Sequence, residues 1–162
     1  MNKQITFDFN TKLSKAARIL FGSRLVYLAD HLKTVKASSR EYNHSTFGAN
    51  IKLVKGTLCG TSACALGDAV LSGKFPDLLL EFVSDTPLRT DGEYYLATQK
   101  HGMFATSAIA KEADAYFGPD AYYNIFSPSA FDIELGCKNP SKTIVMTRLH
   151  RYAKEAFGYT PP

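Results

Sequence analysis

The residues of this chain whose types and spacing could support chemistry gather in one run of small side chains, residues 59–67, with the sequence CGTSACALG. The run holds two of the three cysteines, and the apolar residues after it predict that a helix begins inside it. Backbone amides at a helix start bind anions, because unpaired N–H groups and the helix dipole both favour negative charge there. The same position lowers the pKa of a thiol, which favours nucleophilic chemistry. The run therefore predicts an anion site or a reactive cysteine.

The anion-site interpretation joins this run to nearby cations and to aromatic rings. Lys52 and Lys55 precede the run, and tyrosines later in the chain supply rings that can stack on a nucleobase. Each tyrosine taken singly fits a core position better, since tyrosine is usually half-buried with its hydroxyl at the surface. The predicted ligand-binding residues are Lys52, Lys55, Cys59, Gly60, Thr61, Ser62, Tyr94 and Tyr122.

A cysteine-dependent enzyme centred on Cys59 or Cys64 is a second use of the same run. Such an enzyme needs a histidine beside the sulfur, and the four histidines all lie far away in sequence, without a recognised cysteine-hydrolase signature. The spacing of the two cysteines also differs from that of a zinc knuckle, so we predict no metal site and no cofactor. A purely structural role fits as well, since free cysteines are often buried and small residues let helices approach closely. The balance favours a protein that is not an enzyme.

Charge is segregated along the chain and bears on the kind of partner. Residues 1–55 carry ten Lys and Arg against three Asp and Glu, a net charge of +7, whereas residues 77–134 carry a net charge of −7. Such asymmetry can indicate a face that binds an anionic partner. It can equally reflect a basic and an acidic surface that contact only solvent. No DNA- or RNA-reading motif is present, so nucleic acid is not an expected partner. The basic N-terminal region also fits a protein that blocks a host protein, and a homo-oligomer is compatible with all of these roles.

Length and hydropathy favour one cytoplasmic domain over residues 1–162. A chain of 162 residues with 45% apolar content is large enough for one core. No apolar run approaches the ~20 residues that a bilayer crossing needs, and the first residues lack the apolar centre of a secretory signal. An odd cysteine count fits a reducing compartment. We therefore expect a cytoplasmic protein with reduced thiols and no membrane partner.

Periodicity and capping residues predict mostly helices. A first helix, 12–21, follows a cap at Asn10 or Thr11 and stops at Gly22, and a second covers 23–35. Residues 37–57 read as a long loop with an extended piece at 50–54. Further helices are expected at 63–71, closed by Gly73, and at 103–117 and 120–126.

Three segments complete the expected architecture. Residues 78–83 are either a short helix or a strand, and Asp91-Gly92 between apolar flanks indicates a hairpin turn. The last helix has Asn139 as its cap, Pro140 at its first position and Gly158 at its end. The predicted fold is α+β and predominantly helical, a small helical bundle with a short β-hairpin.

The order of these features resembles a family of small uncharacterised bacterial and bacteriophage proteins with a Cys-Gly-Thr-x-x-Cys-Ala-x-Gly signature. The resemblance covers most of the chain: the helix before the signature, the CGTSACALG run, the ADAYFG element at 113–118 and the YYNIF element at 122–126. It implies the fold and a bacterial or phage origin, and no particular activity. The chain departs from the family at Asp68, where a small or aromatic residue is usual, and an acid there disfavours an anion site.

Together these observations predict a phage or bacterial accessory protein that binds a small phosphorylated ligand, in particular a nucleotide. Such a protein could sequester a host immune signalling nucleotide in the host cytoplasm. A cysteine-dependent enzyme and a protein that inhibits a host factor by direct contact are the two alternatives.

Overall fold

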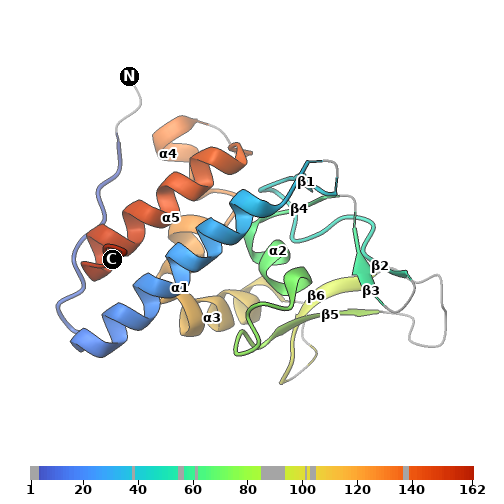
Figure 1. Ribbon diagram of the computed structural model, residues 1–162, viewed down its shortest axis with the longest axis horizontal. Helices are drawn as coiled ribbons and strands as arrows, with labels where there is room; N and C mark the ends of the chain where they lie inside the picture. Colours follow the sequence, from blue (N-terminus) through green and yellow to red (C-terminus); the bar gives the residue numbers. More distant parts are fainter. Residues whose placement is uncertain are drawn as a thin grey trace.

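The computed structural model describes residues 4–37, 39–54, 57–60, 62–84, 94–100, 102, 105–136 and 139–162. It is mixed α+β and predominantly helical, as predicted (Figure 1). The helices are α1 Lys15–Thr34, α2 Ala65–Ser72, α3 Thr106–Phe117, the π-helical η1 Tyr122–Phe126, α4 Asp132–Leu135 and α5 Lys142–Phe157. The strands are β1 Glu41–Tyr42, β2 Lys52–Val54, β3 Thr57–Cys59, β4 Ser62–Ala63, β5 Leu80–Ser84 and β6 Tyr94–Thr98.

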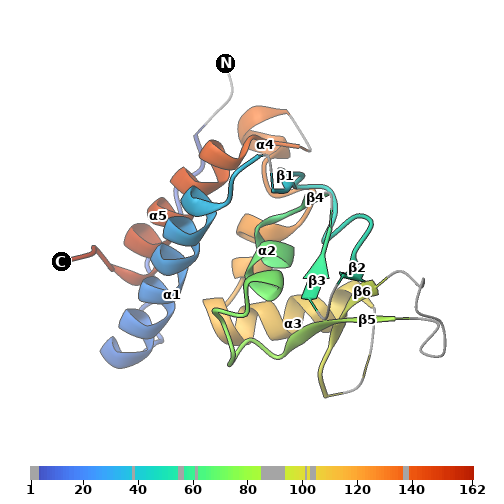
Figure 2. The ribbon, with the colours of Figure 1, turned by 45° about the vertical axis from the view of Figure 1, so that its right-hand side comes forward.

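The elements separate into a helical end and a strand-bearing end. Figures 1 and 2 show α1 and α5 side by side at one end, the pairs β2–β3 and β5–β6 at the other, and α2 and α3 between them. Pairing is antiparallel in β2–β3 and β5–β6 and parallel in β1–β4. One apolar cluster runs through all these layers. Among the described residues, no helix combines the length and the apolar character that crossing a bilayer requires.

Helix α1 is continuous, so the predicted break at Gly22 is wrong. Ser14, rather than Asn10 or Thr11, caps it by accepting a hydrogen bond from the Ala17 amide at 3.1 Å. Glycine inside a helix costs about 1 kcal/mol relative to alanine, but a Cβ at Gly22 would lie 2.2 Å from Cβ of Tyr159. The close approach of the C-terminal segment therefore explains the glycine, and packing outweighs its low helix propensity.

Helix α5 starts two residues later than predicted and ends at Gly158, as predicted. Its cap is Ser141, whose hydroxyl accepts from the Ile144 amide. Asn139, the predicted cap, instead accepts a hydrogen bond from the His44 amide at 2.9 Å. Apolar spacing along this helix predicts a core face, and four of those positions, Leu149, Tyr152, Ala153 and Phe157, are buried. Ile144, expected on the same face, is 38% exposed, whereas Arg148 is only 1% exposed, so the buried face includes a charge.

Helix α2 begins at Ala65, after Cys64 at the N-cap, and closes at Gly73 with a φ of 68°. The predicted placement of 60–63 at a helix start is therefore wrong: Ser62 and Ala63 form β4 and pair with β1. A Cβ on Gly67 would lie 1.6 Å from the carbonyl oxygen of Phe47. Glycine at this position lets the loop before β2 lie directly against α2.

The remaining segments settle the ambiguous predictions. Residues 80–84 are a strand, β5, which pairs with β6, so the hairpin exists; Asp91-Gly92, predicted as its turn, lies outside the described residues. Strand β2 confirms the extended piece inside 50–54. Helix α3 begins at Thr106 rather than 103, and the short helix predicted for 120–126 is the π-helix η1.

Candidate functional site

The predicted ligand-binding residues that the structure describes lie in two different parts of the fold. Lys52 is exposed on β2, while Gly60 and Tyr94 both lie against Ile51. The Tyr94 amide donates to the Ile51 carbonyl at 2.9 Å, and a Cβ on Gly60 would lie 2.2 Å from Cδ1 of Ile51. These three positions belong to the strand-bearing end, where Gly60 and Tyr94 contact Ile51.

The other predicted residues lie elsewhere or outside the description. Ser62 is buried in β4, where it pairs with β1. Lys55, Thr61 and the side chain of Cys59 lie outside the described residues. Tyr122 belongs to η1 and lines a pocket to which none of the other predicted residues contributes within the described part of the chain.

That pocket, called here the His44–Tyr122 pocket, has a volume of about 220 Å³. It lies where the loop before β2, the start of α3 and η1 meet. Its wall combines aromatic rings with polar groups that come from these three segments. The residues used below are His44, Thr46, Phe47, Thr106, Tyr122 and Phe126.

His44 is buried in the wall and has a fixed tautomer. Its Nε2 lies 2.8 Å from the carbonyl oxygen of Ser127, and its Nδ1 lies 3.2 Å from the hydroxyl of Tyr42. Because a carbonyl only accepts, Nε2 carries the proton and Nδ1 accepts from Tyr42. Burial lowers the pKa of His44, and the charge of Arg148 acts in the same direction. His44 is therefore a neutral, fully engaged group rather than a free base.

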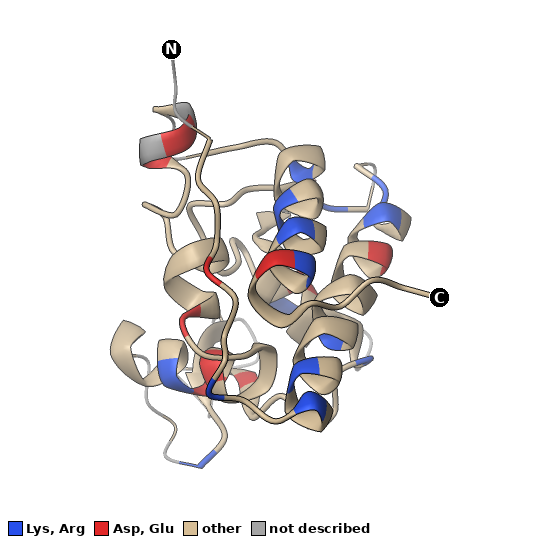
Figure 3. Cartoon of the chain, turned by 90° about the vertical axis from the view of Figure 1, so that its left-hand side faces the viewer, with Lys and Arg blue, Asp and Glu red and all other residues tan. Residues whose placement is uncertain are grey.

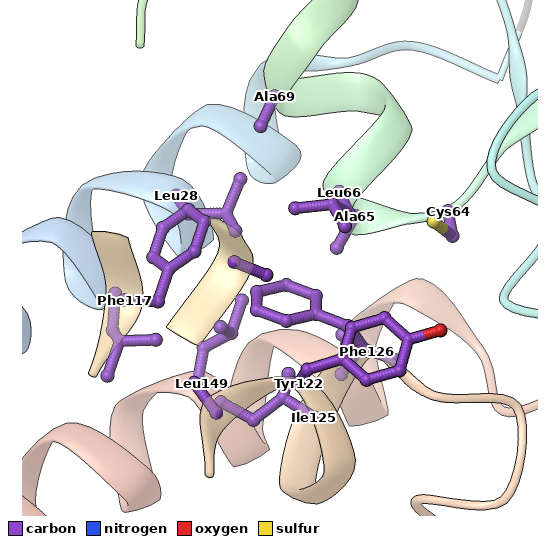
Figure 4. Packing of buried hydrophobic residues seen from close by; sticks show 14 of the residues in the cluster. Leu28, Cys64, Ala65, Leu66, Ala69, Phe117, Tyr122, Ile125, Phe126 and Leu149 are labelled. Carbon is purple, nitrogen blue, oxygen red and sulfur yellow. The ribbon is translucent and has the colours of Figure 1, made fainter. Parts of the chain in front are cut away.

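Tyr122 lines the pocket and has a buried hydroxyl. The residue is 1% exposed, and its hydroxyl has no hydrogen-bond partner. The hydroxyl points out of the apolar cluster on the side where Cys64 lies (Figure 4). Burial raises the pKa of Tyr122 to about 12. A buried polar group without a partner costs about 1–3 kcal/mol, so an added hydrogen bond to this hydroxyl would stabilise the protein.

Cys64 lies behind the same wall and is not a reactive thiol. Its amide donates to the Thr46 carbonyl at 2.9 Å, which ties the wall to α2. Burial raises the pKa of Cys64 to about 11, although the amides of Leu66 and Gly67 act in the opposite direction. The expected lowering of this pKa by the helix start is therefore wrong for Cys64, because desolvation of the thiolate outweighs the dipole.

The start of α3 presents free backbone donors at the pocket. The N-cap is Ala105, which has no side chain to cap the helix. The amides of Ala108 and Ile109 both donate to the Ala105 carbonyl. In the described part of the chain, the amides of Thr106 and Ser107 have no acceptor. Thr106 lines the pocket, so these donors and the helix dipole are available to an anion at its mouth.

Asp68, the departure from the family signature, lies away from these donors. It is buried in α2, and Arg40 donates to its Oδ1 at 2.5 Å. Burial raises the pKa of Asp68, and the Arg40 charge opposes this shift. The acid is thus held by its own cation and does not face the start of α3.

The ionisable side chains in and behind the pocket wall are held in their uncharged forms. Cys64 and Tyr122 are protonated at neutral pH, and His44 is unprotonated. No group of three or more metal-ligating side chains occurs among the described residues. Sequence reasoning missed His44 and Thr106 as wall residues; the only local signal was the alanine where a capping residue would be usual.

Comparisons with protein-family models, with curated proteins and with solved structures returned no match. The interpretation of the pocket therefore rests on its own geometry.

Proposed function

We propose that the protein binds a small phosphorylated ligand with an aromatic ring, a nucleotide, in the His44–Tyr122 pocket and leaves it chemically unchanged. The supporting observation is the Tyr122 hydroxyl, buried and unpartnered in a wall that also contains the uncapped start of α3. The Tyr122 hydroxyl offers a hydrogen bond to the ring of the ligand, and the start of α3 offers amide donors to its phosphate. A nucleotide carries both groups.

The size and the lining of the pocket favour one planar ring. Pockets that enclose a drug-sized ligand have volumes of about 300–1,000 Å³, whereas this pocket has about 220 Å³. It can hold a base and leaves the charged part of the ligand outside. The half-buried ring of Phe47, which packs on Tyr122 with the centroids 6.5 Å apart, provides a surface on which a base can stack.

The phosphate is assigned to the start of α3. Amides at a helix start bind phosphate through direct hydrogen bonds and through the dipole. Thr106 and Ser107 are exposed there, so a phosphate reaches them without displacing a neighbouring side chain. Lys52 and Lys55, predicted for this role, are not needed in the arrangement.

The biological setting follows from the family resemblance. A phage or bacterial accessory protein that sequesters a host signalling nucleotide in the cytoplasm must hold its ligand without consuming it. The un-ionised states of Cys64 and His44 favour such a role over a cysteine-dependent enzyme.

A proline substitution at Thr106 tests the phosphate contact. Thr106→Pro removes one amide donor, and proline is tolerated at the first helical position. Ala105, at φ −61° and ψ 131°, already has the conformation that a residue before proline prefers. We expect nucleotide affinity, measured by calorimetry across mono-, di- and cyclic nucleotides, to fall about tenfold or more relative to Thr106→Ala, which removes the hydroxyl alone. Equal affinities, or no binding by any nucleotide, would contradict the proposal.

A new cap at Ala105 provides a test in the opposite direction. Ala105→Asp places a carboxylate where the phosphate is proposed to bind. We expect the free energy of unfolding to rise by about 1 kcal/mol, because Asp is a good N-cap and Ala is a poor one. Nucleotide binding should fall at the same time. A variant that is stabilised and still binds normally would place the phosphate elsewhere.

A further inference from the structure

A second pocket lies between α4, α5 and the first described residues of the chain. It has a volume of about 390 Å³. Figure 3 shows Lys and Arg positions recurring along the ribbons of α1 and α5. The residues that matter in its wall are Phe131, Glu134, Ile144, Thr147, Arg148 and Arg151. This set is called the α5 pocket.

Arg148 forms the floor of the α5 pocket and has one unmatched donor. Its guanidinium lies over the Phe131 ring, 3.7 Å from the centroid. One terminal nitrogen donates to the carbonyl oxygens of Asn124 and Ala130, and the other donates to Glu134. The remaining donor, Nε, is buried without a partner. Charged donors of this kind form the stronger hydrogen bonds of proteins.

The wall has more positive than negative charge. Glu134 is its one carboxylate among the described lining residues, and it accepts from both Arg148 and Arg151 as well as from the Ile5 amide. The carboxylate of Glu155 lies 3.8 Å from Arg151 but is outside the pocket. Two guanidinium groups thus share one carboxylate inside the wall. This imbalance favours an anion as the occupant.

The rest of the wall is apolar and favours an occupant with a hydrocarbon part. Ile144 is 38% exposed on α5, an unusual position for a large aliphatic side chain, and the buried Phe131 also lines the wall. A phosphate alone would leave the exposed surface of Ile144 in water. A carboxylate joined to a short apolar chain matches both halves of the wall.

We propose that the α5 pocket binds an organic carboxylate with a short apolar body. Its carboxylate lies against Arg151, on the side of the wall that holds the buried Arg148, and its hydrocarbon part covers the exposed side chain of Ile144. The site shares none of its described lining residues with the His44–Tyr122 pocket, so it stands independently of the nucleotide proposal.

Hexanoate is a suitable probe, with hexanamide as the neutral molecule of the same shape. Binding to the full chain is followed by NMR chemical shifts of the backbone amides of α5. We expect hexanoate to shift residues around Ile144 and Arg151 and to bind at least about tenfold more tightly than hexanamide, since only the carboxylate forms a charged pair. Equal affinities for the two probes would overturn the proposal. An absence of shifts at about 10 mM hexanoate would also overturn it and would assign the Arg148 donor to bound water.

A pair of charge-removing variants separates a built site from general attraction. Arg151→Gln removes a wall cation, and Lys154→Gln removes an exposed cation of the same helix outside the wall. We expect hexanoate affinity to fall about tenfold in the first variant and less than about twofold in the second. Equal losses would show that the probe responds only to the net charge of the surface. Arg148 itself is left intact because its removal endangers the fold.

Discussion

The two pockets differ in the ionisation of the buried side chains around them. Around the His44–Tyr122 pocket, burial suppresses ionisation: the pKa values of Cys64 and Tyr122 rise to about 11 and about 12, and that of His44 falls. At the α5 pocket the pKa of Arg148 falls only to about 10, so the side chain stays charged at neutral pH and is paired with Glu134. One region avoids buried charge, whereas the other keeps it and satisfies it. From this contrast we conclude that a buried ionisable residue indicates chemical reactivity only when it keeps its charge in the folded protein.

The largest expected effect is the loss of the buried cation. Arg148→Met leaves Glu134 with one partner fewer and removes the donor from two carbonyl groups. We expect the free energy of unfolding, measured by urea denaturation, to fall by about 3–5 kcal/mol. Arg151→Met is the control, because Arg151 is more exposed and its ion pairs should contribute about 1 kcal/mol or less. Similar losses in the two variants would remove the contrast between buried and surface charge.

The pH dependence of stability should reveal the neutral histidine. The pKa of His44 is lowered in the folded protein, so below its ordinary value of 6.5 the unfolded chain binds more protons than the folded one. Stability should therefore fall as the pH drops from 7.5 to 5.5, with a contribution of at most about 1.4 kcal/mol per pH unit from each such histidine.

Variants assign this slope to particular residues. His31 is buried with a lowered pKa as well, so it contributes with the same sign. Subtracting the unfolding curves of His44→Gln from those of the unchanged protein isolates the His44 contribution and cancels that of His31. A difference that is flat with pH would mean that His44 is not held neutral by the fold.

The smallest expected effect comes from the unpartnered hydroxyl. Tyr122→Phe removes a group that has no hydrogen bond, so we expect stability to stay unchanged or to rise by up to about 1 kcal/mol. Tyr152→Phe is the matched control, because the Tyr152 hydroxyl donates to the Pro119 carbonyl at 2.7 Å. That variant should lose about 1 kcal/mol. If Tyr122→Phe were the more costly change, the Tyr122 hydroxyl would have an internal partner.

Much of the fold could be predicted from the sequence, because long amphipathic segments are local signals. Periodicity predicted helices in the segments of α1 and α5, and the glycine after α5 marked its end, but α1 was divided at Gly22 and the start of α5 was placed two residues early. The errors arose where distant parts of the chain decide the outcome. Gly22 stays helical because Tyr159 packs on it, and Asn139 does not cap α5 because it binds the His44 amide instead. Such contacts leave no trace in local spacing.

The candidate sites were less predictable for the same reason. His44, Thr106 and Tyr122 are separated widely in sequence and meet only through the packing of three segments. The chemistry expected of Cys64 followed from its position before a helix, but the depth of burial, which reverses the pKa shift, is a tertiary property. Arg148 likewise gave no sign that it would be buried, since arginine is usually exposed.

Gly67 shows that the CGTSACALG run has a packing role. With the Phe47 carbonyl pressed against its α-carbon, no larger residue can stand there without moving the loop that carries Phe47. Cys64 and Ala65 are buried under the same constraint. The small residues of the run are thus explained by the close contact between α2 and the loop that carries Phe47. When two chains share a run of this kind, the similarity is evidence of a common fold, even where their ligands differ.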